Sequence, residues 1–239
     1  MEHPQKPALP PITQGQGTRD EIQARIQKSK YRLLAPYTLP LIPTIYLASA
    51  SPRRQKLLRQ IGVDFEVLPA DVPEHALARE APADYVRRLA VNKARFGLAE
   101  LGRRGLPERP VLGADTCVAV DGEILGKPRD RADGLAMLRR LSGRGHEVLT
   151  GICVIARDAC GQTAEHSAVN VSQVTFAALS ERDLADYWAS GEPADKAGGY
   201  AIQGRAAGFI ERLEGSYSGV MGLPLHELTQ ILIKLGPQA

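Results

Sequence analysis

The chain has 239 residues, of which 44% are hydrophobic and 24% are charged. This composition is typical of globular proteins rather than of disordered or membrane proteins. No segment approaches the roughly 18 consecutive apolar residues of a membrane span, and the first twenty residues lack the apolar core of a signal peptide, so we expect no membrane partner. Three cysteines without a CxxC pair exclude a disulfide framework and favour a cytoplasmic protein.

The net charge of +3 originates in the first 44 residues, which hold six bases and three acids, so that residues 45–239 carry 24 of each. A fold that binds nucleic acid through a broad basic face has an excess of bases, and we therefore expect no nucleic-acid partner. The same segment holds seven of the 17 prolines. We predict a partly disordered extension over residues 1–44, with one short helix beginning near Thr18, and a folded domain over residues 45–239.

From Ile45 onward, patterns typical of strands and of helices alternate along the chain, which predicts an α/β fold. The strand over residues 111–120 is expected to be interrupted at residues 113–116, and Asp121-Gly122 predicts a hairpin turn. The expected strands cover residues 45–48, 63–68, 111–120, 148–156 and 168–176, and the expected helices cover residues 52–61, 83–102, 132–141, 180–188 and 224–235.

The first candidate site lies between the first strand and the first helix, where Ser49, Ser51, Arg53 and Arg54 gather at a helix N-terminus that begins with proline. Unpaired backbone N–H groups, hydroxyls and guanidiniums suit a phosphate. Two alternatives are an ordinary capped helix with surface arginines and a short arm for the DNA minor groove.

Two lysines are candidates for the same anion. Lys93 falls on the apolar stripe of its helix, where its head either snorkels to solvent or meets an anion. Lys127 follows a segment that superficially resembles a P-loop, but the spacing of the glycines and Pro128 exclude a Walker-type site. Lys127 is therefore either a phosphate contact or a solvated lysine.

Asp115 is the candidate carboxylate, because aspartate is disfavoured within strands and a strand interruption would hold it at the edge of a cleft for a metal or a proton. The alternative is a turn aspartate that caps local backbone. The glycines around Gln203 indicate close backbone approach, either to a ligand or to a neighbouring segment. There is no GxSxG or HExxH motif, and the histidines lack metal-ligand spacing.

Taken together, four cations, a helix N-terminus and a cleft carboxylate suit a polyphosphate and a divalent metal. Five segments in this order resemble the Maf family of nucleoside triphosphate pyrophosphatases, and the resemblance runs from about Ile45 to the C-terminus. These segments are residues 47–58 (LASASPRRQKLL), 112–116 (LGADT), 126–130 (GKPRD), 195–204 (DKAGGYAIQG) and 222–225 (GLPL).

The resemblance implies a Maf/ITPase-like fold, a mixed twisted sheet flanked by helices in two lobes about a central cleft. It implies hydrolysis of a nucleoside triphosphate between its α and β phosphates with Mg²⁺ or Mn²⁺. The family's proton acceptor matches Asp115, its loop glutamate matches Glu74, and its two lysines match Lys93 and Lys127. We expect Glu74 and Asp115 to hold the metal, while the cations neutralise the triphosphate and the leaving pyrophosphate.

The resemblance also bears on the substrate. The subfamily similar to dTTP/UTP pyrophosphatases carries Arg, Thr and Gln at the positions of Arg53, Thr116 and Gln203. The amide of Gln203 offers both a donor and an acceptor to the imide edge of uracil or thymine. Ser49, Ser51 and Arg54 complete the expected substrate-binding set, and removal of non-canonical nucleotides is a further expected role.

Three rival functions stay open at this point. The 7-methyl-GTP branch of the family has an aromatic residue after Ser-Pro, Gln after the catalytic Asp and Ser-Glu-Gly near the end, and this sequence departs from it at all three places. The second rival is a modified-nucleotide pyrophosphatase, and the third is a non-catalytic, nucleotide-binding regulator of septum formation. The joint presence of Glu74, Lys93, Asp115 and Lys127 argues against a pure binder. Family members are often dimers, so a homodimer is the expected assembly if the chain associates.

Overall fold

The structure, a computed structural model, describes residues 43–157 and 162–236. The helix expected near Thr18 therefore lies outside the described residues. Within them, no helix combines the length and the hydropathy needed to cross a bilayer.

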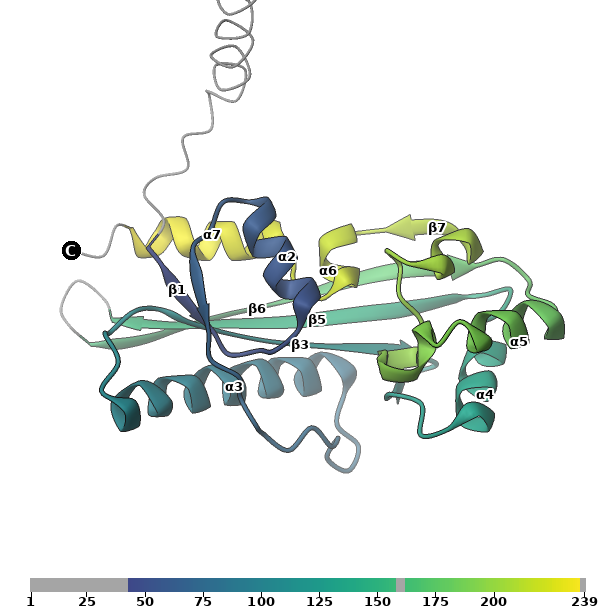
Figure 1. Cartoon of the computed structure of the whole chain (residues 1–239), viewed down its shortest axis with the longest axis horizontal. Coiled ribbons are helices and arrows are strands. Elements are labelled where there is room, and N and C mark those ends of the chain that lie inside the picture. The colour runs from purple at the N-terminus through teal and green to yellow at the C-terminus, as the bar shows by residue number, and fades with distance from the viewer. Residues whose placement is uncertain (1–42, 158–161, 237–239) are drawn as a thin grey trace, which may run out of the picture. The chain divides into compact units, whose positions relative to one another are not determined.

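One mixed sheet of seven strands organises the described part of the chain (Figure 1). The strand order is β2-β1-β3-β5-β6-β7, and β4 pairs with β3 beside this path. β1 is parallel to both of its neighbours, and the remaining pairs are antiparallel. The strands are β1 (Ile45–Leu47), β2 (Phe65–Val67), β3 (Val111–Val120), β4 (Glu123–Leu125), β5 (Gly145–Arg157), β6 (Thr163–Phe176) and β7 (Ile210–Glu214).

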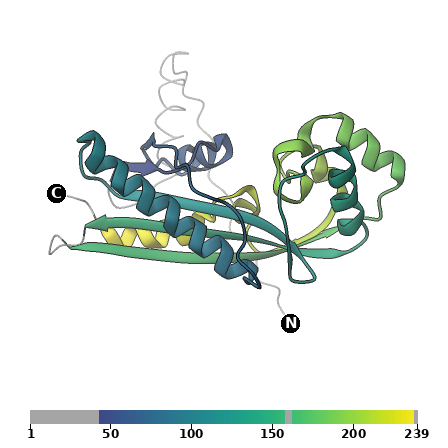
Figure 2. The ribbon, with the colours of Figure 1, turned by 90° about the horizontal axis from the view of Figure 1, so that it is seen from below.

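Helices cover both faces of this sheet. α2 and α7 lie on one face and α3 on the other, while α4 and α5 pack together at the opposite end of the long strands (Figures 1 and 2). The α-helices are α2 (Pro52–Gln60), α3 (Pro82–Arg104), α4 (Arg131–Leu141), α5 (Glu181–Ala189), α6 (Tyr217–Met221) and α7 (Leu225–Leu235). Three short 3-10 helices, η1 (Glu192–Asp195), η2 (Ala197–Gly199) and η3 (Arg205–Phe209), lead from α5 into β7.

Two hydrophobic clusters divide the domain into two lobes. One cluster packs α2 and α7 against the sheet and includes Leu57, Ile152 and Leu228. The other packs α4 and α5 and includes Leu138 and Phe176. β5 contributes Ile152 to the first cluster and Val148 to the second, so one continuous strand passes through both lobes. This agrees with the expected two-lobed, helix-flanked sheet.

Glycines set the distance between α3 and the sheet. A Cβ atom at Gly113 of β3 would lie 2.1 Å from the carbonyl oxygen of Ala90, and one at Gly151 of β5 would lie 2.4 Å from that of Val86. Real Cβ atoms do not approach backbone so closely, and only glycine fits at both places. Helix α3 therefore packs directly against the backbone of β3 and β5.

The structure corrects the expected interruption of the third strand. β3 runs without a break from Val111 to Val120, and Asp115 pairs with Gly151 of β5 within it. The interruption lies in the neighbours of β3. On the outer edge of β3, β1 pairs with residues 111 and 112, and β4 pairs with residues 118–120. Residues 113–117 of β3 lie between these two contacts and pair with no other described strand on that side. An aspartate is accommodated here because the sheet edge beside it is open.

The remaining expectations differ from the structure mainly in length and in short elements. β2 is shorter than expected, whereas β5 and β6 are longer. The hairpin turn is confirmed, with φ of 54° at Asp121 and 77° at Gly122. Ser51 occupies the N-cap position of α2, but its hydroxyl makes no capping hydrogen bond. β7 and α6 were not expected.

Candidate active site

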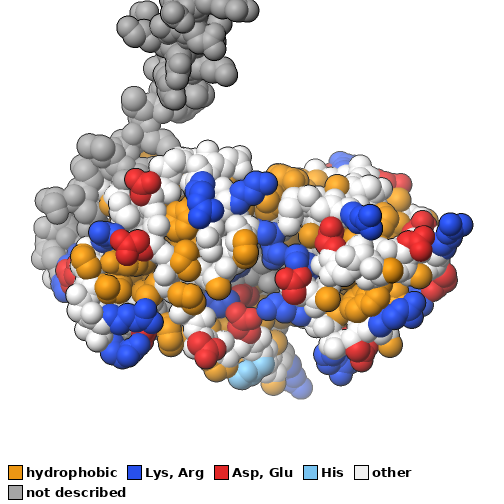
Figure 3. Space-filling model, in the orientation of Figure 1, with side chains coloured by type: hydrophobic (Ala, Val, Ile, Leu, Met, Phe, Trp, Pro, Cys, Tyr) orange, Lys and Arg blue, Asp and Glu red, His pale blue; other side chains and the backbone are white. Residues whose placement is uncertain are grey.

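A cavity of about 560 Å³ opens at the gap in the sheet edge. Adjacent side chains of a strand point to opposite faces of the sheet. Asp115 accordingly contacts α3, whereas Thr116 contacts α2. Because no strand covers this edge, one cavity reaches both side chains. Lys, Arg, Asp and Glu side chains gather around the hollow between the lobes (Figure 3).

Lys93 joins two carboxylates on the α3 side of the cavity. Its Nζ donates to Glu74 Oε1 at 2.5 Å and to Asp115 Oδ1 at 2.6 Å, and only 7% of its side chain is exposed. The head of Lys93 therefore meets anions, and the snorkelling alternative is wrong. Burial raises the pKa of Glu74, but the hydrogen bond and charge of Lys93, with Lys127 and Arg54 behind it, leave that pKa below its ordinary value.

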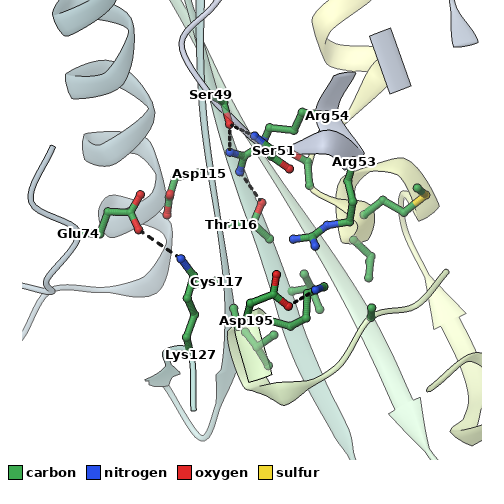
Figure 4. A pocket seen from close by; sticks show the side chains of 18 of the residues that line it. Ser49, Ser51, Arg53, Arg54, Glu74, Asp115, Thr116, Cys117, Lys127 and Asp195 are labelled. Atoms are coloured by element: carbon green, nitrogen blue, oxygen red, sulfur yellow. Dashed lines mark hydrogen bonds and ion pairs between the residues drawn. The ribbon is translucent and has the colours of Figure 1, made fainter. Parts of the chain in front are cut away.

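Glu74 lies in the loop after β2, and α3 holds that loop. The hydroxyl of Tyr85 donates to the carbonyl oxygen of Glu74 at 2.9 Å. Burial raises the pKa of Tyr85, so the phenol keeps its proton and remains a donor. Nζ of Lys127, on the loop after β4, lies 4.0 Å from Glu74 Oε2, and its side chain is mostly exposed (Figure 4). Lys127 thus faces the same carboxylate from the opposite wall.

Arg54 connects three walls of the cavity. Its Nε donates to the carbonyl oxygen of Gly222 at 2.8 Å, and its two terminal nitrogens donate to Ser49 Oγ at 3.0 Å and to Thr116 Oγ1 at 3.3 Å (Figure 4). Burial lowers the pKa of this guanidinium, and the charge of Asp115 opposes that effect. Three of the five N–H groups of Arg54 are used within the protein, so it holds the segment after β1, β3 and the residue after α6 together while two N–H groups remain for a ligand.

The N-terminus of α2 points its donors into the same cavity. Ser49 Oγ accepts from Arg54 and from the backbone N–H of Ser51 at 3.3 Å, which leaves its own proton for a ligand. Arg53 follows on the first turn. Burial lowers its pKa and the charge of Asp195 raises it. Among the described residues no hydrogen bond or ion pair holds the guanidinium of Arg53, and it points across the cavity towards Asp195 (Figure 4). This arrangement presents several donors to an anion.

The opposite wall comes from the glycine-rich segment after η1. The N–H of Gly198 donates to the carbonyl oxygen of Gly126 at 3.0 Å, and a Cβ atom at Gly198 would lie 2.9 Å from Val118. Gly198 also has a φ of 65°. These glycines serve close packing between neighbouring segments, which was one of the two expected explanations. The exposed side chain of Gln203 lines the cavity beyond them.

Comparison with known proteins places this chain in a family. The sequence model of the family described as Maf-like protein matches residues 44–235. The chain belongs to the Maf-like protein family.

Relatives of this Maf-like chain are similar over most of its length. A protein of Ralstonia nicotianae named dTTP/UTP pyrophosphatase is 55% identical over 196 residues, which cover 80% of this chain and 93% of that protein. One of the same name from Burkholderia pseudomallei is 52% identical over 202 residues, covering 82% of this chain and 95% of the relative. Among solved structures, a HAM1 protein from Coxiella burnetii is 15% identical and has a TM-score of 0.45, with 80% of this chain and 98% of that chain covered.

The structure of this Maf-like chain brings all ten predicted site residues to one cavity. Their individual roles in binding and catalysis remain predictions. The ten are Ser49, Ser51, Arg53, Arg54, Glu74, Lys93, Asp115, Thr116, Lys127 and Gln203.

Sequence reasoning missed two charged residues of the cavity, Asp195 and Lys196. They form an ion pair, in which Lys196 is 16% exposed and Asp195 is 75% exposed. The bond to Lys196 lowers the pKa of Asp195 below its ordinary value, with the charge of Arg53 adding to the effect. Both residues begin the segment DKAGGYAIQG, so a charged pair directly before a glycine-rich turn was the available signal.

Proposed function

We propose that this protein hydrolyses dTTP and UTP between the α and β phosphates and releases a nucleoside monophosphate and pyrophosphate, with Mg²⁺ or Mn²⁺ as cofactor. The observation that carries the proposal is the Glu74–Lys93–Asp115 triad beside the N-terminus of α2 in one cavity. Its substrate comes from relatives that are more than half identical and bear the name dTTP/UTP pyrophosphatase. We also propose a cytoplasmic location, because the cysteines of the described residues, Cys117 and Cys153, are free thiols, as in proteins of a reducing compartment.

The carboxylates fit a hard divalent cation. Glu74 and Asp115 supply oxygen donors, the ligand type that Mg²⁺ and Mn²⁺ prefer. The described residues contain no group of three or more Asp, Glu, His or Cys side chains that could enclose a metal. Two carboxylates with substrate phosphates and water are the usual set for Mg²⁺ at a nucleotide. Such a bound cation would neutralise phosphate charge as it develops.

Side chains of the protein accept the proton of the attacking water and stabilise the leaving pyrophosphate. Asp115 accepts its hydrogen bond from Lys93 at Oδ1, which orients the carboxylate and leaves Oδ2 for the proton of a water molecule. The oxygen of that water attacks the α phosphorus in line, and the bond from this phosphorus to the α–β bridging oxygen breaks. Lys127, Arg53 and the N-terminus of α2 stabilise the negative charge on the departing pyrophosphate.

The wall around Thr116 provides the selection of the base. Arg53, Thr116 and Gln203 are the residues that resemble the dTTP/UTP subfamily, and all three line the cavity. Gln203 can pair with an imide edge through one donor and one acceptor. The 7-methyl-GTP alternative is not favoured, since the chain departs from that branch and the relatives above bear the pyrimidine name.

The test is an incubation of the full chain with a panel of nucleoside triphosphates, in which pyrophosphate and orthophosphate are measured separately. We expect pyrophosphate and monophosphate from dTTP and UTP, loss of activity with EDTA, and recovery with Mg²⁺ or Mn²⁺. Release of orthophosphate alone would overturn the cleavage position. Full activity in EDTA would overturn the metal requirement. Faster turnover of 7-methyl-GTP would overturn the substrate.

A further inference from the structure

Thr150 is a fully buried hydroxyl residue that sits directly beneath the cavity. It belongs to β5 and pairs in register with Thr116 of β3. The two hydroxyl oxygens are 2.9 Å apart, and Thr150 Oγ1 also lies 2.8 Å from the carbonyl oxygen of Gly219 in α6. Thr150 does not line the cavity, so any effect on a ligand must pass through its two partners, Thr116 and the α6 segment.

The hydrogen bonds of this pair have only one consistent direction. A carbonyl oxygen can only accept, so the single proton of Thr150 goes to Gly219. The bond between the two hydroxyls must then use the proton of Thr116, with Thr150 as acceptor. Arg54 donates to Thr116 Oγ1 from the other side at 3.3 Å. Thr116 therefore has no proton left for a ligand and keeps one lone pair.

We infer that Thr150 is a positioning residue that fixes Thr116 as an acceptor-only group and thereby makes the site select bases that bring a hydrogen-bond donor at N3. The inference rests on the proposed function. Uracil and thymine carry an N–H at N3, whereas N3 of cytosine is an acceptor. An acceptor-only Thr116 is complementary to the imide and leaves two acceptors facing each other with cytosine. Unmatched polar groups of this kind discriminate strongly between similar ligands.

The experiment compares UTP with CTP, and dTTP with dCTP, for the wild type, Thr150→Val and Thr150→Ser. Valine keeps the shape and removes the hydroxyl, so the proton of Thr116 is released and can turn to a ligand. We expect Thr150→Val to reduce the UTP-over-CTP ratio of kcat/KM about five- to tenfold, the effect of one hydrogen bond. Thr150→Ser keeps the hydroxyl and should restore the wild-type ratio. In a Thr116→Val background, Thr150→Val should change the ratio no further.

Several outcomes would overturn the inference. They are an unchanged ratio in folded Thr150→Val, an equal change in Thr150→Ser, and equal use of UTP and CTP by the wild type. If Thr150→Val does not fold, Thr150→Cys provides the comparison, because a thiol is a weak donor and a weak acceptor.

Binding of the α,β-methylene analogues of UTP and CTP is measured in parallel by calorimetry. A wild type that releases no pyrophosphate would overturn the proposed function, and the binding ratio would still decide whether Thr150 sets the preference.

Discussion

Asp115 and Thr116 are consecutive residues of β3, and their side chains lie on opposite faces of the sheet. Asp115 accepts a hydrogen bond from Lys93 of α3, whereas Thr116 accepts one from Arg54 of α2. A closed sheet would separate these faces. Here the outer edge of β3 is open between its contacts with β1 and β4. The carboxylates on one face and the wall around Thr116 on the other, for which we propose base selection, thus meet in a single cavity. Each can therefore be disturbed separately by mutation.

The first prediction concerns the proposed base. Asp115→Asn keeps the shape of the side chain but removes its capacity to accept a proton, so we expect kcat to fall roughly 100- to 10,000-fold. Pyrophosphate release from dTTP gives the rate. Asp121→Asn is the matched control, because Asp121 directly follows the same strand, its side chain is exposed, and asparagine tolerates its φ of 54°. Undiminished activity of Asp115→Asn would contradict the assignment.

The second prediction concerns the cation between the carboxylates. Lys93 holds the pKa of Glu74 below its ordinary value despite the opposing effect of burial. Removal of this charge in Lys93→Met should raise that pKa, so the acid limb of the kcat/KM profile should move to higher pH and the rate should fall. Lys127→Met should move the limb less, because Nζ of Lys127 lies 4.0 Å from Glu74 and is mostly exposed. An acid limb that stays in place in Lys93→Met would show that Lys93 does not control Glu74.

Most of the candidate site is predictable from the sequence because its residues belong to short segments with clear local signals. A lysine on an apolar stripe and a carboxylate within a strand each depart from the local rules of their element, and such departures are typical of functional sites. Lys93 illustrates this well, since its helix and its buried face were both predicted and only its partners were missing. Local pattern therefore predicts most of the fold and several of the proposed site residues, whereas Glu74 and the substrate roles of Thr116 and Gln203 come only from the resemblance to the Maf family.

What the sequence could not provide depends on contacts between distant segments. The open edge of β3 results from where β1 and β4 stop pairing, and no local pattern in β3 records that. β7 and α6 are five residues each, too short for a reliable period, and β7 has no fully buried residue. Thr150 was indistinguishable from any strand threonine until its register with Thr116 was known.

The third prediction concerns the support of Gln203. Glu192 accepts a hydrogen bond from the hydroxyl of Tyr187 at 2.7 Å and from the backbone N–H of Arg205 at 3.0 Å, so it fixes the turn after Gln203. Glu192→Gln replaces one of the two acceptor oxygens with an NH2 group and so places a donor against one of these donors. We expect KM for dTTP to rise severalfold with a smaller change in kcat. Glu181→Gln, an exposed glutamate paired with Arg139, is the control. Equal KM values in the two variants would argue against this support.

The fourth prediction concerns His146, which is buried on β5 and bonded to the hydroxyl of Tyr200 at 2.8 Å. Burial, with the charge of Arg144, lowers its pKa from 6.5 to about 4. Between these values the unfolded chain binds a proton that the folded protein does not. Stability is therefore complete above about pH 6.5 and decreases as pH falls towards 4, by roughly 3 kcal/mol in all.

Urea unfolding at a series of pH values measures this loss. His146→Phe should flatten the dependence between pH 4 and 6.5, even if the variant is less stable at every pH. His226→Asn, a change at an exposed position of α7, is the control and should retain the wild-type slope. A slope unchanged in His146→Phe would place the titration elsewhere.

The fifth prediction uses two glycines at the contact of α3 with the sheet. A Cβ atom at Gly113 would lie 2.1 Å from the carbonyl oxygen of Ala90 and 2.5 Å from the nitrogen of Ala94, so Gly113→Ala must push α3 outward. Because Lys93 lies between these two residues, the same displacement lengthens its bond to Asp115. We expect a lower melting temperature and a loss of kcat together.

Gly102→Ala is the control on the same helix, because a Cβ atom at Gly102 meets nothing within 4 Å. This change should stabilise the protein by about 1 kcal/mol, because alanine is the better helix former. Thermal melts and dTTP turnover of both variants test this, and a Gly113→Ala protein as stable and active as the wild type would show that the seat of α3 on β3 does not set the geometry of the site.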